Sequence, residues 1–144
     1  MMRMSRAAAA VAFAIAASTV AAHELKIKDF EFIHPWTREP PRKVKDVPVY
    51  MVVRNTGSAG DRIVAVASPF ATKGELRAGK ADGGGQLPAI EIAANATLEL
   101  NADGPHILLL GLTEPLDGYQ YFPLLLTFER AGQIEIEVYV EEPN

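Results

Sequence analysis

Apolar residues in this chain recur at every second position or in short runs, and Gly, Pro, Asn and Asp separate these segments. This period of two is typical of β-strands, and no segment after residue 22 shows a sustained helical pattern. Short strands with turn signals at regular spacing predict an all-β domain, a sandwich or barrel with Greek-key connections. The expected strands are 25–27, 30–32, 47–54, 62–67, 89–93, 97–100, 106–110, 124–129 and 134–140.

Two details of this pattern concern the segments that contain the histidines. The apolar phase changes at Lys28-Asp29, which predicts a turn or a bulge between two extended pieces. If the turn is a two-residue hairpin, it pairs His23 with His34. The run 106–110 is apolar throughout and is expected to be buried on both faces. The segments 40–43 and 78–85 are expected to be solvated loops.

The N-terminal 22 residues have the pattern of a signal peptide. Arg3 and Arg6 precede an apolar run, and small residues follow at Val20 and Ala22. We expect cleavage after Ala22, export to the periplasm and a mature chain, 23–144, that begins with His23. The remaining 122 residues suit a single domain, with no transmembrane segment expected in it.

Charge and composition exclude several function classes. The formal net charge is −4, and it becomes −6 when the two arginines of the signal are removed, which argues against nucleic acid as a partner. The chain has no cysteine, so neither a disulfide nor a thiolate ligand or nucleophile is available. There is no G-x-S-x-G elbow and no P-loop, and we do not expect an enzyme.

From His23 onward the chain resembles the periplasmic copper chaperone family PCu(A)C, whose members are cupredoxin-like β-sandwiches. The matching segments are 23–26 (HELK), 33–38 (IHPWTR), 40–41 (PP), 49–51 (VYM), 55–57 (NTG), 82–84 (DGG), 105–106 (PH), 109–112 (LLGL), 123–124 (PL), 126–129 (LTFE) and 131–132 (AG). The resemblance implies a cupredoxin-like Greek-key β-sandwich that binds copper and delivers it to a periplasmic or membrane-bound copper enzyme.

The methionine-based ligands typical of that family are missing. The first His-x-Met of the family falls on Arg77 and Gly79, the hairpin 83–87 has no Met, and the second reads His106-Ile107-Leu108. Met51 is the one methionine left after the signal. Because thioethers are the soft ligands that select Cu(I), we expect Cu(II) held by nitrogen and oxygen.

Three histidines are available as ligands: His23, His34 and His106. A free N-terminal His offers its α-amine and its ring Nδ1 to one Cu(II) ion, and a second imidazole completes a histidine brace. PCu(A)C-like domains without the Met motif are known to use such a brace, and this sequence resembles that subgroup. His106 is the first candidate for the second imidazole, and His34 is the other.

Other readings of these residues stay open. His106 is alternatively a core histidine whose ring bonds to backbone. The resemblance also leaves room for a further, weaker ligand, either Met51 or a carboxylate, and the sequence does not choose among Asp46, Asp61, Asp82 and Asp103. The alternative functions are a metal-free interaction module that has lost its ligands and a histidine-brace oxidative copper enzyme. No flat aromatic platform for a polymer is evident, which argues against the enzyme.

Overall fold

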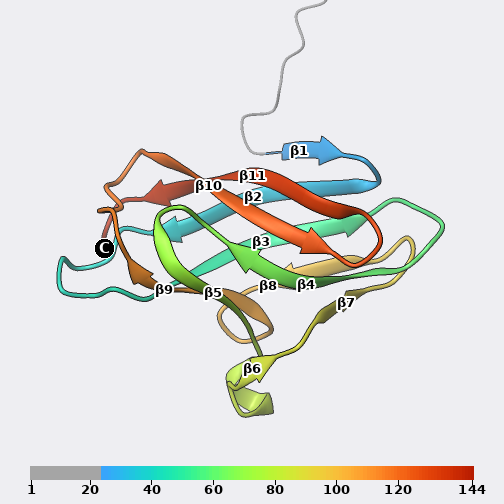
Figure 1. Cartoon of the computed structure of the whole chain (residues 1–144), viewed down its shortest axis with the longest axis horizontal. Coiled ribbons are helices and arrows are strands. Elements are labelled where there is room, and N and C mark those ends of the chain that lie inside the picture. The colour runs from blue at the N-terminus through green and yellow to red at the C-terminus, as the bar shows by residue number, and fades with distance from the viewer. Residues whose placement is uncertain (1–23) are drawn as a thin grey trace, which may run out of the picture.

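The computed structural model describes residues 24–144, which form two β-sheets around one core (Figure 1). The predicted signal peptide and His23 lie outside the described residues. The elements are β1 (Glu24–Ile27), β2 (Phe30–Arg38), β3 (Val47–Asn55), β4 (Asp61–Ala67), β5 (Ala71–Arg77), the 3-10 helix η1 (Lys80–Asp82), β6 (Gln86–Leu87), β7 (Ile90–Ile92), β8 (Thr97–Leu100), β9 (His106–Leu112), β10 (Tyr121–Phe128) and β11 (Gly132–Glu141). The predicted all-β cupredoxin-like sandwich is confirmed.

Strand β3 joins the two sheets. Its first residues, from Val47 to Val49, pair with β9, while its second half pairs with β8 and with β2. The strands follow one another in the order β6-β5-β9-β3-β2-β11-β10-β4-β7, with β1 and β8 beside this path. All pairs are antiparallel except β11 with β2, which run in the same direction in Figure 1.

The predicted turn at Lys28-Asp29 is a two-residue hairpin. Ile27 pairs with Phe30, and the ladder continues to Glu24 opposite Ile33. Lys28 has a positive φ of 56°, as the first residue of a tight hairpin turn requires, and its Nζ bonds to the carbonyl of Ala131. The register of this hairpin fixes how the N-terminal end of β1 meets β2.

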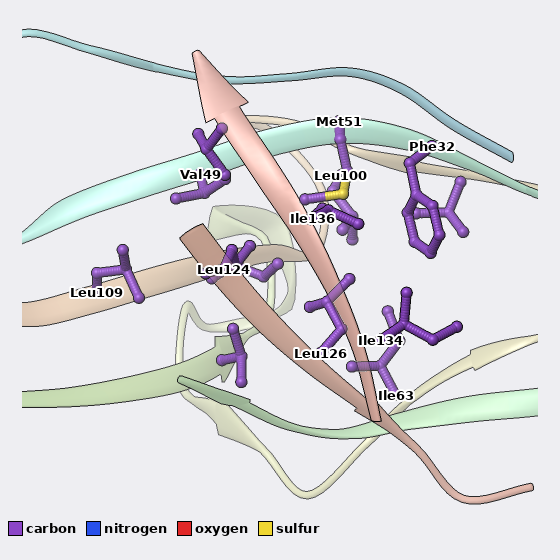
Figure 2. Packing of buried hydrophobic residues seen from close by; sticks show 14 of the residues in the cluster. Phe32, Val49, Met51, Ile63, Leu100, Leu109, Leu124, Leu126, Ile134 and Ile136 are labelled. Carbon is purple, nitrogen blue, oxygen red and sulfur yellow. The ribbon is translucent and has the colours of Figure 1, made fainter. Parts of the chain in front are cut away.

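The core consists of the inward-facing residues of both sheets (Figure 2). Phe30 stacks on Phe128 with ring centroids 4.3 Å apart, and the apolar positions of β3, β10 and β11 alternate with more exposed residues, as predicted. The expectation that 106–110 is buried on both faces was wrong. Ile107 and Leu109 are buried, whereas Leu108 and Leu110, on the other face of β9, are half-buried.

Strand β5 was not predicted. Its sequence, ATKGELR, lacks apolar alternation, yet it forms a ladder with β9 from Ala71 opposite Leu112 to Arg77 opposite His106. Gly74 lies where β5 passes β4, and a Cβ at this position would overlap the carbonyl of Val66. The backbone pairing and this close crossing, not a sequence pattern, determine the strand.

Candidate metal centre

His34 lies at an irregularity in β2. The pairing of β2 with β3 shifts between Ile33 and Trp36, and His34 has a positive φ of 48°. Residues other than glycine seldom adopt this conformation, which costs on the order of 1–3 kcal/mol and persists where the surroundings fix it. The imidazole is 39% exposed, so it is accessible at the surface of the sandwich.

Two strands share the edge of β2 on either side of His34. Strand β1 pairs with residues up to Ile33, and β11 pairs in parallel from Trp36 to Arg38. This arrangement brings the end of β11 to the histidine: Glu141 Oε1 lies 3.1 Å from His34 Nε2. The other carboxylate oxygen of Glu141 lies 3.5 Å from Arg38 Nη2. A carboxylate therefore lies beside the imidazole.

A row of aromatic rings connects the two described histidines. The ring of His34 stacks with Trp36 at 6.1 Å between centroids, Trp36 contacts Tyr50 at 5.2 Å, and Tyr50 contacts His106 at 6.2 Å. Arg38 lies 5.6 Å from the centre of the Trp36 ring. Two rings thus separate the imidazoles along this row, and the structure does not bring His34 and His106 into one cluster.

An apolar groove of about 350 Å³ adjoins this row. Its lining comes from β2, β3, β8 and the turn after β8, and it includes Ile33, His34, Trp36, Tyr50, Val52 and Leu100. Burial, and then the negative charge of Asp103, raise the pKa of the Tyr50 hydroxyl, which therefore stays neutral at physiological pH. His34 is the imidazole in the lining of this groove.

His106 has different neighbours. Its Nδ1 lies 2.9 Å from the carbonyl of Gly104, and the residue is half-buried, so the ring bonds to backbone as the alternative reading expected. Its partner across the ladder is Arg77, whose guanidinium lies 2.9 Å from Glu75 Oε2 and bonds to the carbonyl of Gly84. A fixed cation thus faces the strand position of His106.

The Glu75 carboxylate anchors this cation. Glu75 is buried, and a hydrogen bond from Lys73 followed by the charge of Arg77 lowers the pKa of its carboxyl group despite the opposing effect of burial. Lys73 Nζ lies 3.0 Å from Glu75 Oε1. Arg77 is therefore held in place by an ionised partner, and it occupies a position where the PCu(A)C resemblance implies a histidine ligand.

Gly79 occupies the other lost ligand position of this loop. A Cβ at Gly79 would overlap the carbonyl oxygen of Asp103, in the turn that precedes His106. No side chain fits here without a movement of backbone. The loop at Gly79 and the turn at Asp103 therefore pack too closely to leave space for a methionine at position 79.

The remaining sequence candidates have other partners. Met51 is 3% exposed, and Figure 2 shows its sulfur pointing into the core, which argues against a role as a weak ligand. Asp46 accepts a bond from the backbone N–H of Gly111. Asp61 accepts bonds from Arg62, Arg130 and Ala131, which lower the pKa of its carboxyl group although burial opposes this. Asp82 lies in η1.

The described residues contain no group of three or more His, Asp or Glu side chains placed to hold a metal ion. Between residues 24 and 144 there is also no helix long and apolar enough to cross a membrane. Sequence reasoning missed Glu141, which lies 107 positions from His34 in the chain and reaches it through the parallel pairing of β11 with β2.

The sequence of the chain matches a known protein family. Residues 31–140 match the family described as "Putative lipoprotein LpqE-like". The chain belongs to this LpqE-like family. The match begins in β2 and ends in β11; it includes His34 and stops one residue before Glu141. No curated protein sequence matches this LpqE-like chain.

Solved structures of PCuAC domains resemble this LpqE-like protein. The copper-bound PCuAC domain from PmoF2 has a TM-score of 0.75 and 25% identity, with 84% of this chain and 99% of that domain covered. The solution structure of CuI-DR1885 from Deinococcus radiodurans has a TM-score of 0.67 and 25% identity, with 88% and 85% covered. The apo PCuAC domain from PmoF1, at 23% identity and a TM-score of 0.75, shares the fold. The resemblance to PCu(A)C domains is confirmed.

Proposed function

We propose that this LpqE-like protein is an exported copper carrier that binds Cu(II) through a histidine brace and delivers it to a copper enzyme. The brace consists of the α-amine and ring Nδ1 of His23 and the imidazole of His34. Two similar solved structures are described as copper-bound or CuI forms, and both share the sandwich of this chain. We propose a binding and transfer function, without catalysis.

The β1–β2 register is the observation that supports this pairing. Glu24 lies opposite Ile33, so one further step of the same antiparallel ladder would set His23 opposite His34. In a regular antiparallel ladder, directly opposed residues have Cβ atoms about 4.5–5.5 Å apart, and the positive φ of His34 sets the direction of its side chain at this point. Cleavage after Ala22 would supply the free amine, and it would make copper binding depend on export.

The donor chemistry favours Cu(II). An amine and two imidazoles are nitrogen donors of the kind that tetragonal Cu(II) prefers. The one sulfur of the mature chain, in Met51, is directed into the core. A negative charge from Glu141 lies beside His34, whereas the charge opposite His106 is the positive guanidinium of Arg77. For this reason we place the second imidazole at His34, and His106 is the alternative to be tested.

Trp36 provides a direct test. It is the single tryptophan of the chain, and its ring lies 6.1 Å from that of His34. Cu(II) quenches tryptophan emission at short range, so titration of the mature protein should quench Trp36 fluorescence with a 1:1 end point. A matched His23→Ala protein keeps the free amine but loses the ring Nδ1 of the chelate, and it should need far more copper.

Equal binding by the two proteins would contradict the brace. An absence of copper binding by both would instead support the metal-free interaction module. A transfer assay would then test delivery: the copper-loaded protein should lose its ion to an apo copper enzyme faster than to a chelator of equal affinity.

A further inference from the structure

The carboxylate of Glu141 lies within hydrogen-bonding distance of the His34 ring. Its Oε1 lies 3.1 Å from His34 Nε2, while Oε2 lies 3.5 Å from Arg38 Nη2. Arg38 and Glu141 are also direct partners in the parallel pairing of β2 with β11. The carboxylate is therefore held between a cation and the imidazole, and the side chain of Glu141 is 30% exposed.

The chemistry of this contact fixes the tautomer of the ring. An ionised carboxylate only accepts hydrogen bonds, so the proton of the pair must be on His34 Nε2. In a neutral imidazole the proton on one nitrogen leaves the lone pair on the other. The Glu141 contact thus favours a ring that presents Nδ1, and not Nε2, to a metal ion.

We propose that Glu141 is a positioning residue of the copper site, which holds His34 as the Nε2–H tautomer so that Cu(II) binds through Nδ1. This inference rests on the proposed function, because it concerns the same site. A carboxylate bonded to the distal nitrogen of a metal-binding histidine orients the ring and raises its basicity, and loss of such partners typically weakens binding about 10–100-fold.

The backbone around His34 supports the same assignment. The positive φ of 48° and the register shift after Ile33 set the direction in which the side chain leaves β2. The stacking against Trp36 limits rotation of the ring, and Arg38 both contacts Trp36 and pairs with Glu141. One face of the imidazole and its Nε2 are thereby engaged by residues of β2 and β11.

The first experiment needs no copper. Nitrogen-15 NMR of the mature apo protein in mildly alkaline buffer should report the Nε2–H tautomer for His34, and Glu141→Ala should shift the ring toward a mixture of tautomers. Glu135→Ala, which removes an exposed carboxylate from the same strand, should leave His34 unchanged. A wild-type ring protonated on Nδ1, or a ring insensitive to Glu141→Ala, would overturn the proposal.

The second experiment measures Cu(II) affinity by competition with a chelator. Glu141→Ala should raise Kd about 10–100-fold, and Glu141→Gln, whose amide oxygen still accepts a hydrogen bond, should restore most of the affinity. Equal affinity of Glu141→Ala and wild type would reject a positioning role. If wild type has the expected tautomer but binds no copper, the proposed function fails, while the effect of Glu141 on the ring stands.

Discussion

The two described histidines lie at opposite ends of one row of rings, but their electrostatic surroundings differ. His34 lies beside the carboxylate of Glu141, at an exposed irregularity of β2. His106 bonds to the backbone of Gly104 and faces the position of Arg77, which Glu75 holds in place. The negative charge beside His34 favours binding of a cation there, whereas the positive charge opposite His106 disfavours it.

This difference explains how a PCu(A)C fold can change its metal chemistry. The His106 loop has an arginine where the family resemblance implies a histidine, and the glycine at position 79 leaves no space for a methionine. The frame of the sandwich does not depend on these ligands, because its core is formed by other residues. A new site near His34 therefore needs only a free amine and the existing hairpin register.

The largest expected effect separates the two histidines. His34→Ala removes one of the three proposed nitrogen ligands and should raise the Kd for Cu(II) by more than about 100-fold, beyond the range usual for outer partners of a ligand. His106→Ala should change Kd less than about threefold. Competition titrations of both variants measure this, and a reversed order would assign the second imidazole to His106.

The next prediction concerns a substitution that adds a second imidazole opposite His106. Arg77→His removes the cation and sets two imidazoles on directly opposed residues, close enough to share an ion. Equilibrium dialysis should show copper stoichiometry rising from one to two. Arg77→Ala is the matched control, which removes the same charge without adding a ligand, and it should stay at one. A second equivalent in both variants would mean that the added imidazole is irrelevant.

A third prediction concerns the packing that excludes a side chain at position 79. Gly79→Ala places a Cβ against the carbonyl of Asp103 and should lower the free energy of unfolding by about 2 kcal/mol, as overpacking does. Gly85→Ala in the same loop meets no atom within 4 Å and should have little effect. Urea denaturation compares them. Equal stability of the two variants would show that the loops adjust freely.

The smallest expected effect is the acid sensitivity of the Arg77 anchor. Because the folded-state pKa of Glu75 lies below its ordinary value of 4.5, its contribution to stability is complete above that pH. This contribution should decline as the pH falls through the lowered pKa. Glu75→Gln should flatten the dependence of the urea midpoint on pH below about 4.5, whereas the exposed Glu135→Gln should not. If the urea midpoint depends on pH in the same way in all three proteins, the Glu75 carboxylate does not contribute to the acid sensitivity.

The sequence predicted those parts of the molecule that depend on local patterns. The phase change at Lys28-Asp29 indicated the hairpin, and the alternation after residue 124 indicated β10 and β11. The pattern failed for β5, where long-range pairing with β9 overrides a polar sequence containing Gly74. The contact of Glu141 with His34 depends on parallel pairing of distant segments, which no local spacing encodes.

The sequence also indicated some features of the candidate site and missed others. Composition pointed away from a sulfur-rich site, because one methionine remains after the predicted signal, and the nature of the donors stays a prediction. The alternation of β3 also shows why Met51 is unavailable, since it shares the buried face of Val49 and Val53. Neither composition nor spacing indicated that Arg77 would face His106, because that pairing required the unpredicted strand β5.

Electron paramagnetic resonance of the mature protein with one equivalent of Cu(II) tests the central claim most directly. The account predicts an axial spectrum with nitrogen hyperfine structure from an amine and two imidazoles, lost in His34→Ala and in His23→Ala. An aquo-copper spectrum from the wild type, or an unchanged spectrum in both variants, would contradict it.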